Sequence, residues 1–326
     1  MVAGQYGAVP ATQPAQAPIA AAPLAGMAQP VAQWKALQQT DALPFDSYFS
    51  FISAHPGWPG EAGFRRTLER KAATDPNTPV TSVAAFCRRW KPLTAAGWIA
   101  CARAYQATGA TIDAQVAART GWRLGNLSPQ DETTVLTQFA SALSPADHDA
   151  RTDALLWQGA TSSAQRMLAY TSEAARPLFT ARLAFRSNAE NASALAASYD
   201  AIGARDAGYI ADKAMWLRNS GASPSARGWL ARTRTGMTRP GNVEKFYEAL
   251  LVNARAAAAD GQWQTAYDIA RQIDDAYPAG TDVSTKPYGE RDDYTSLAWL
   301  AGQAALKLGR PADARAMFER YGLGSQ

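Results

Sequence analysis

Residues 256–268 read AAAADGQWQTAYD, and residues 304–316 read AALKLGRPADARA. In both stretches a glycine is followed five residues later by an alanine, with helix-forming residues on either side. Glycine accepts the left-handed backbone conformation that ends an α-helix. Alanine in the first turn of the next helix lets that helix cross its predecessor closely. The pattern therefore predicts two antiparallel helices joined by a tight turn.

The same glycine–alanine pair occurs five times along the chain, at Gly109/Ala114, Gly159/Ala164, Gly221/Ala226, Gly261/Ala266 and Gly309/Ala314. Such repetition is typical of an array of helical hairpins. Successive glycines are 50, 62, 40 and 48 residues apart, whereas a tetratricopeptide array repeats about every 34 residues. We therefore predict an all-α fold, an irregular right-handed superhelix (solenoid) of antiparallel hairpins that is similar to a tetratricopeptide array.

The composition supports this fold and narrows the class of partner. Of 326 residues, 47% are hydrophobic and only 18% are charged, and much of the apolar content is alanine, the best helix former. The net charge of +4 is mild for this length and disfavours a dedicated nucleic-acid binder. Two basic clusters are either solvated helix faces or weak attractors of an anionic polymer, namely Arg65, Arg66, Arg70 and Lys71, and Arg88, Arg89 and Lys91.

The start of the chain differs in composition from the rest. Residues 1–30 carry five prolines and no charged side chain, which predicts a disordered Ala/Pro/Gln-rich tail, followed by a helical scaffold domain over residues 31–326. No stretch approaches the ~20 apolar residues of a membrane span. The beginning of this chain also lacks the positive start and apolar block of a signal peptide.

Turn signals and apolar spacing locate several helices. They predict helices over Pro44–Ala54, Glu61–Ala73, Val80–Trp90 and Thr94–Thr108. Serine followed by proline marks three further helix starts, at Ser128, Ser144 and Ser223. The stretch Tyr277–Gly289, with two prolines and two glycines, is expected to be a loop.

The cysteines and tryptophans each leave two interpretations open. Cys87 and Cys101 lie in helical patterns on either side of the short turn Lys91–Thr94, so they form either a disulfide or two small buried apolar groups. The ten tryptophans are either large anchors between hairpins or, for one or two of them, part of a surface on which a sugar or peptide stacks.

Residues that could perform catalysis form no convincing pattern. His55 and His148 are the two histidines, and neither belongs to a metal-ligand motif, so we expect no metal site. The acidic cluster Asp147, His148, Asp149 and Asp153 is better explained as a helix cap and an exposed acidic face than as a general acid–base pair. Nucleophile elbows and phosphate-binding loops are absent. We therefore assign no catalytic, cofactor-binding or metal-binding residue, and the ligand-binding residues stay unassigned.

Several segments go beyond generic helices. They are Trp34–Trp58 (WKALQQTDALPFDSYFSFISAHPGW), Gly125–Asp153 (GNLSPQDETTVLTQFASALSPADHDARTD), Met215–Gly221 and Tyr294–Gly309 (YTSLAWLAGQAALKLG). Together they resemble the N-terminal superhelical U domain of soluble lytic murein transglycosylases of the alphaproteobacterial type, over most of residues 34–321. In that family a lysozyme-like C-terminal domain cleaves the glycan strands of peptidoglycan in the periplasm, with one glutamate as acid and then base.

This chain departs from the family at the catalytic motif. The family's glutamate is followed by serine, whereas none of the nine glutamates here is, and no Met-Gln pair occurs. The resemblance therefore implies a non-catalytic scaffold portion, expected in the periplasm, that holds or guides peptidoglycan strands. Its further partners would be a catalytic domain or other cell-wall proteins. The alternative is a protein-interaction solenoid of the tetratricopeptide type.

Overall fold

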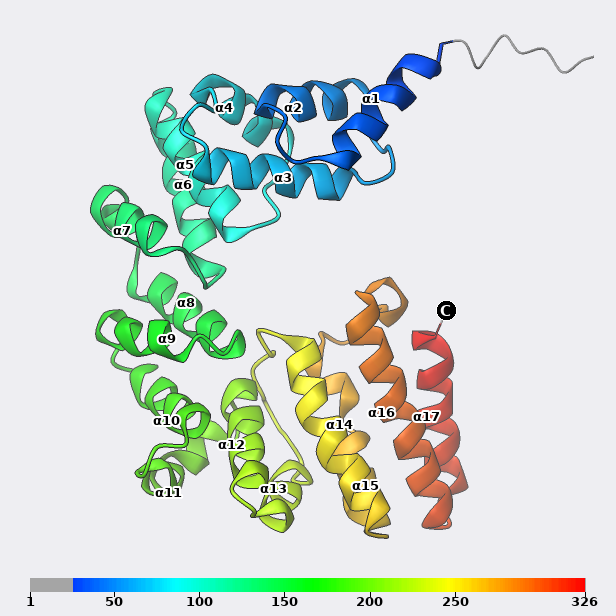
Figure 1. The fold of residues 1–326 in the computed structure, drawn as a ribbon. Helices are drawn as coiled ribbons and strands as arrows, with labels where there is room; N and C mark the ends of the chain where they lie inside the picture. Colours follow the sequence, from blue (N-terminus) through cyan, green and yellow to red (C-terminus); the bar gives the residue numbers. More distant parts are fainter. Residues whose placement is uncertain (1–25, 326) are drawn as a thin grey trace, which may run out of the picture. The chain divides into compact units, whose positions relative to one another are not determined.

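The computed structural model describes residues 26–325 and shows an all-α protein. Within these residues the chain forms seventeen α-helices, four short 3₁₀-helices and no β-strand (Figure 1). This confirms the predicted fold class at the level of secondary structure. The chain divides into two compact units, one up to Leu68 and one from Glu69 onward, and each is described here by itself.

The first unit is built around a cluster of aromatic side chains. It contains α1 (Ala28–Gln39), α2 (Phe45–Ala54) and the first half of α3 (Glu61–Thr74). The ring of Phe51 meets that of Trp58 edge-on at 5.5 Å between centroids, and the Trp34 indole N–H donates to the carbonyl of Pro59 at 2.7 Å. Because α1 begins at Ala28, the last residues of the predicted tail are helical, while residues 1–25 lie outside the described residues.

The second unit consists of successive helices that pack on their neighbours in sequence. Their bounds are α4 (Val80–Arg89), α5 (Ala95–Ala107), α6 (Thr111–Arg123), α7 (Pro129–Gln138), α8 (Pro145–Trp157), α9 (Thr161–Met167), α10 (Arg176–Ser187), α11 (Ala192–Gly203), α12 (Ala207–Asn219), α13 (Ser223–Leu230), α14 (Val243–Ala259), α15 (Trp263–Ala270), α16 (Tyr288–Lys307) and α17 (Pro311–Gly324). The predicted loop before α16 contains a single 3₁₀ turn, η4 (Val283–Thr285).

The five predicted glycine turns share one backbone geometry. Each glycine has a φ between 71° and 84°, a region that other residues enter at a cost. The N–H of the residue after it donates to the carbonyl five residues back at 2.8–2.9 Å, the hydrogen bond of a Schellman motif. In all five turns the next helix begins two residues after the glycine. Each turn therefore ends one helix and sets the start of its antiparallel partner.

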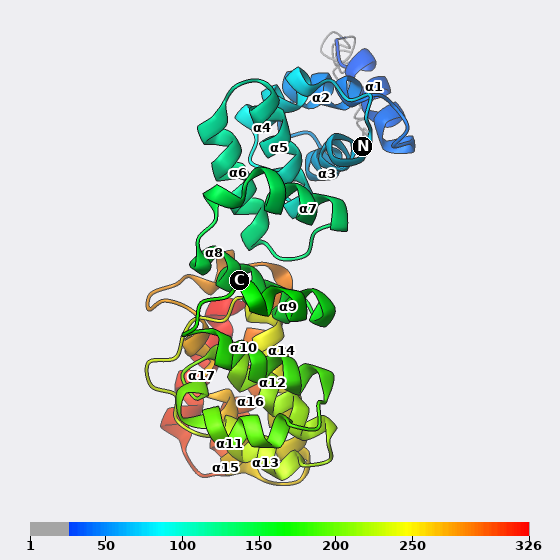
Figure 2. The same cartoon turned by 90° about the vertical axis from the view of Figure 1, so that its left-hand side faces the viewer.

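The five paired alanines lie where the two helices of each hairpin meet. Each has at most 1% of its surface exposed, as the close-crossing prediction requires. Four of the helices that precede these turns, α8, α12, α14 and α16, form a row together with α10, which precedes a similar turn at Asn188. The helices α8, α10, α12, α14 and α16 contact one another in that order, and we call them the first-helix row. The second helices α13 and α15 contact each other as well, and they lie side by side in Figure 2.

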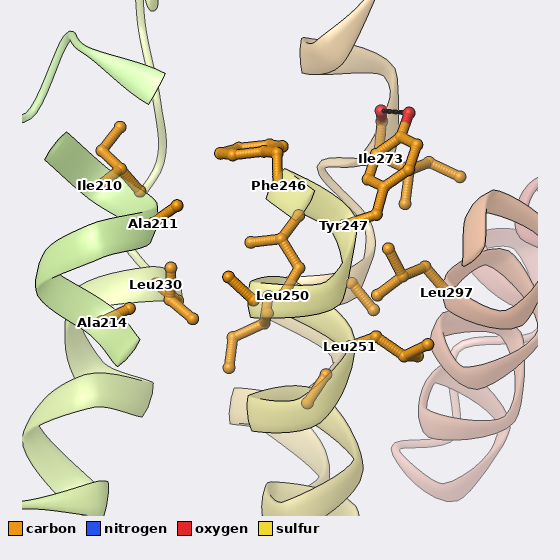
Figure 3. Close-up of a cluster of buried hydrophobic side chains, with 14 of the residues drawn as sticks. Ile210, Ala211, Ala214, Leu230, Phe246, Tyr247, Leu250, Leu251, Ile273 and Leu297 are labelled. Carbon is orange, nitrogen blue, oxygen red and sulfur yellow. Dashed lines mark hydrogen bonds between the residues drawn. The ribbon is translucent and has the colours of Figure 1, made fainter. Parts of the chain in front are cut away.

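The core between hairpins is made of the apolar stripes that the sequence predicts. Phe246, Tyr247, Leu250 and Leu251 of α14 are all buried. Figure 3 shows Phe246 pointing toward α12, whereas Tyr247 and Leu251 point toward α16. The Tyr247 hydroxyl donates to the Ile273 carbonyl at 2.8 Å, which satisfies the one polar atom this side chain brings into the core.

All three predicted serine–proline helix starts are confirmed, and two of the three serines are N-cap residues. Ser128 and Ser144 are N-cap residues, and the backbone N–H of Ser144 donates to Asp147 at 2.7 Å. Ser223, by contrast, is the first residue of α13, and Ala222 occupies the N-cap. Ser223 is not the N-cap because the turn at Gly221 sets the start of the next helix two residues after the glycine.

Candidate ligand-binding groove

A hollow of about 480 Å³ opens among four helices of the first-helix row, α8, α10, α12 and α14. We call it the Trp216 groove. It is lined by Trp157, Gly159, Thr161, Phe185, Arg186, Asn188, Ala211, Asp212, Met215, Trp216, Asn219, Ser220, Lys245, Glu248 and Ala249. The mixture of aromatic rings with amide, hydroxyl and charged groups is typical of a small-molecule or polymer-binding site.

Aromatic side chains form the apolar part of the groove. Phe185 of α10 and Trp216 of α12 are stacked, with centroids 5.2 Å apart and planes 25° from parallel. Trp157, the last residue of α8, is buried, whereas Trp216 is half-buried. Because Phe185 fixes the Trp216 ring from one side, the indole offers a rigid flat surface to a ligand.

The turn after α10 carries an asparagine where the other five turns carry glycine. Asn188 has φ 50°, the one non-glycine residue with positive φ in the described part of the chain. The N–H of Ala189 donates to the Ala184 carbonyl at 2.9 Å, so the Schellman motif is complete. The Asn188 side-chain oxygen accepts the Trp216 indole N–H at 3.1 Å. Asparagine tolerates this backbone conformation, and its side chain orients the indole, which glycine could not do.

Charged groups of both signs line the groove. The Asp212 carboxylate accepts from Arg186 at 2.7 Å and from Arg182 at 2.8 Å. On α14, Lys245 and Glu248 form an exposed ion pair at 2.7 Å. A ligand therefore meets hydrogen-bond donors and acceptors around the stacked rings, without a strong net field of either sign.

Arg182 is a buried cation that joins three helices beneath the groove. Its guanidinium bonds Asp212 of α12 and Asp153 of α8, and it lies 5.3 Å from the centre of the Trp157 ring. Burial by itself would lower the pKa of Arg182, but Asp212 and Asp153 raise it above its usual value. The side chain therefore stays charged and holds α8, α10 and α12 together under the aromatic surface.

The acidic cluster singled out in the sequence is structural, and the prediction for it is only partly right. Asp147 caps α8, as expected, but its side chain is buried and bonds Arg123, so it is not part of an exposed acidic face. Asp149 bonds the backbone and hydroxyl of Ser172, and Asp153 bonds Arg182. The reason is that the neighbouring helices bring their own donors to this helix.

His148 is likewise occupied within the fold. Its ring meets that of Trp122 at 5.7 Å, and its Nδ1 accepts the indole N–H at 3.3 Å. Burial lowers the pKa of His148, although Asp147 and Asp149 act in the opposite direction. A neutral imidazole suits this acceptor role. Across residues 26–325 no group of three His, Cys, Asp or Glu side chains is placed to hold a metal ion.

Cys87 and Cys101 form a disulfide, which decides between the two interpretations of these residues. Their Cα atoms are 5.8 Å apart, and the bond ties α4 to α5 across the turn Lys91–Thr94.

The basic side chains Arg88, Arg89 and Lys91 beside this disulfide are exposed, as are Arg66 and Arg70 of the other basic cluster, on α3. Most members of both clusters thus lie on solvated helix faces.

The tryptophans differ in where they lie. Trp122 and Trp229 are buried anchors, whereas Trp157 and Trp216 line the groove. The sequence could not show which of the ten tryptophans are anchors, since this depends on which helices become neighbours.

None of the described helices is both long and apolar enough to cross a membrane.

An acidic group on α16 gives the second unit a specific pH dependence. Burial, followed by the charges of Glu248, Asp292 and Glu244, raises the pKa of Asp293 to about 6. The folded chain therefore keeps a proton that the unfolded chain loses above about pH 4, so stability falls as the pH rises from about 4 to 6.

We expect Asp293→Asn to raise the free energy of unfolding by about 1 kcal/mol at pH 7, less than the full pKa shift implies because the carboxylate is partly solvated. At pH 4 the same change should have little effect. Urea unfolding of both proteins at the two pH values measures this, and an equal gain at pH 4 and pH 7 would contradict the assignment.

Comparison of the chain with protein-family models, with curated proteins and with solved structures yields no match.

Proposed function

We propose that this chain is a non-catalytic superhelical scaffold of a periplasmic lytic transglycosylase system, and that the Trp216 groove holds peptidoglycan glycan strands. The observation that carries the proposal is the stacked Trp216 ring, oriented by Phe185 and Asn188 and surrounded by groups that can bond hydroxyls. The resemblance of the segments Trp34–Trp58 and Gly125–Asp153 to the transglycosylase U domain supplies the substrate class.

A saccharide suits the chemistry of this groove. Each pyranose ring presents a face of C–H groups and a rim of hydroxyl and amide groups. An indole ring can cover the C–H face, while Asn188, Asn219 and Ser220 can exchange hydrogen bonds with the rim. The mixed charge of the groove, from Arg186 and Lys245 on one hand and Glu248 on the other, also suits a glycan whose attached peptides carry both signs.

The disulfide supports a location outside the cytoplasm. Cys87 and Cys101 are bonded, and stable structural disulfides are typical of oxidising compartments such as the bacterial periplasm. The repeated hairpins support the superhelical arrangement, because identical turns in hairpins that pack mainly on the next hairpin are typical of solenoids. We propose that glycan cleavage belongs to a partner domain or protein, and that this chain alone releases no anhydro-muropeptides.

The test is a pull-down with purified sacculi. We expect Trp216→Ala to lower the affinity about tenfold or more, a loss of about 1.4 kcal/mol or more, because the stacking surface is removed. Trp263→Ala is the matched control. Trp263 is also half-buried, but it lies on α15, the second helix of its hairpin, and does not line the Trp216 groove. Thermal unfolding of each variant checks that the fold is retained.

Asn188→Gly gives a sharper version of the same test. Glycine accepts φ 50° without strain, so the turn is retained while the indole loses its hydrogen-bond acceptor. We expect weaker sacculus binding at unchanged thermal stability. Recovery of the wild-type chain at the level of an unrelated helical protein would refute glycan binding. Enrichment of a protein partner in the absence of glycan binding would favour the tetratricopeptide-like alternative.

A further inference from the structure

Trp299 is the one exposed tryptophan in the part of the chain that the structure describes, with 47% of its surface accessible. Burying a large apolar ring would stabilise the fold, so the stability of the core does not account for the exposure of Trp299 to water. Trp299 lies on α16, the last member of the first-helix row. Two rings of α17 support it, Phe318 at 5.1 Å and Tyr321 at 5.3 Å between centroids.

Polar side chains surround the rings of Trp299 and Tyr321. A second hollow, of about 510 Å³, lies beside Trp299 and Tyr321. Its polar lining comes from Arg255 of α14 and from Asp292, Ser296 and Gln303 of α16. These three residues of α16 and Trp299 recur at helical spacing, so they share one face of the helix. The combination of a flat ring with amide, hydroxyl and charged groups is the one found in the Trp216 groove.

The two aromatic sites lie on one connected surface. α12 contacts α14, and α14 contacts α16. On α14 the exposed side of the helix carries Lys245 and Glu248, which line the Trp216 groove, and two turns later Arg255, which lines the second hollow. Arg255 reaches across to the hydroxyl of Ser296 at 3.4 Å. α14 therefore contributes charged side chains to both sites from one exposed side, on which Val252 lies between Glu248 and Arg255.

We propose that Trp299 and Tyr321 form a second saccharide-binding platform, which contacts the same glycan strand as the Trp216 groove. This inference rests on the proposed function and deepens it, since the ligand becomes a strand long enough to reach both sites rather than an isolated sugar. The occupant follows from the surface itself, because an extended polymer with alternating C–H faces and hydroxyls can use two flat rings together with the charged side chains Lys245, Glu248 and Arg255 of α14.

Two contacts on one polymer have a measurable consequence. Once a strand is held at Trp216, its contact with Trp299 becomes intramolecular, so affinity rises with strand length without any new kind of contact. A fragment too short to span both sites gains nothing from the second platform. Strand length and Trp299 should therefore act together in binding.

The experiment compares two probes by calorimetry, long glycan strands from amidase-treated sacculi and a single disaccharide-peptide fragment. Trp299→Ala should weaken long-strand binding about tenfold and leave fragment affinity within about twofold. Trp216→Ala should weaken both. Leu306→Ala is the control, because Leu306 is an exposed apolar residue of α16 that does not line the second hollow.

The outcomes separate the two proposals. If long strands bind through Trp216 but Trp299→Ala has no effect, the second platform is overturned and the proposed function stands. If the wild-type chain binds neither probe, both proposals fall. Because Trp299 is exposed, its loss should leave thermal unfolding nearly unchanged, and a variant that melts early is replaced by Trp299→Gln, which keeps a long side chain without the ring.

Discussion

Arg182→Met is expected to lower the free energy of unfolding by about 3–5 kcal/mol, as is typical when one partner of a buried ion pair is removed. Arg182 has 1% of its surface exposed and bonds both Asp212 and Asp153. Its loss leaves the buried Asp212 carboxylate with Arg186 as its remaining partner, and it removes the ion-pair partner of the partly exposed Asp153. The three helices α8, α10 and α12 would lose the charge that joins them.

Urea unfolding followed by circular dichroism measures this effect. The matched control is Arg315→Met, which breaks an exposed pair with Glu319 and should change stability by less than about 0.5 kcal/mol. Adding Asp153→Asn and Asp212→Asn to Arg182→Met should recover part of the loss, since neutral groups are cheaper to bury. A variant as stable as the wild type would show that Arg182 has no role in holding these helices.

Removing the disulfide by Cys87→Ser with Cys101→Ser should destabilise the second unit by about 3 kcal/mol, the value typical of a bond that closes a short loop. The two cysteines are 14 residues apart, so the bond removes many conformations from the unfolded chain. Cys101 is buried, and a serine hydroxyl there adds a polar group to the core.

The control for this prediction is reduction. The wild-type chain unfolded and refolded with a thiol reductant should shift to the urea midpoint of the double variant, whereas the variant should not respond to the reductant. A wild-type midpoint that is equal with and without reductant would mean that the bond contributes nothing. The same experiment bears on location, because a chain that needs this bond is poorly suited to a reducing compartment.

Local signals in the sequence located most helices of this fold. The five glycine turns are correct because left-handed backbone at the end of a helix is a local requirement that few residues meet. The sixth turn, at Asn188, escaped notice because asparagine occupies the position that glycine holds in the others. Ser223 also starts a helix as predicted, but as the first residue of α13 and not as its N-cap, because the turn at Gly221 sets where that helix begins.

The groove could not be read in the same way. Its lining residues extend from Trp157 to Ala249 along the chain, and they meet because α8, α10, α12 and α14 become neighbours. The helical pattern says which side of each helix is apolar, but not which exposed sides adjoin. The disulfide was left open for a related reason, because the facing register of α4 and α5 decides whether Cys87 and Cys101 meet.

The uniform turn has an evolutionary consequence. Every glycine turn joins its two helices by a link of the same length, three residues, whether the preceding helix is the 13-residue α12 or the 20-residue α16. A duplicated or deleted gene segment that begins and ends in such links would preserve the junctions on both sides. Descendants of this chain can therefore gain or lose whole hairpins, and so change the length of the helical array, without new turn sequences.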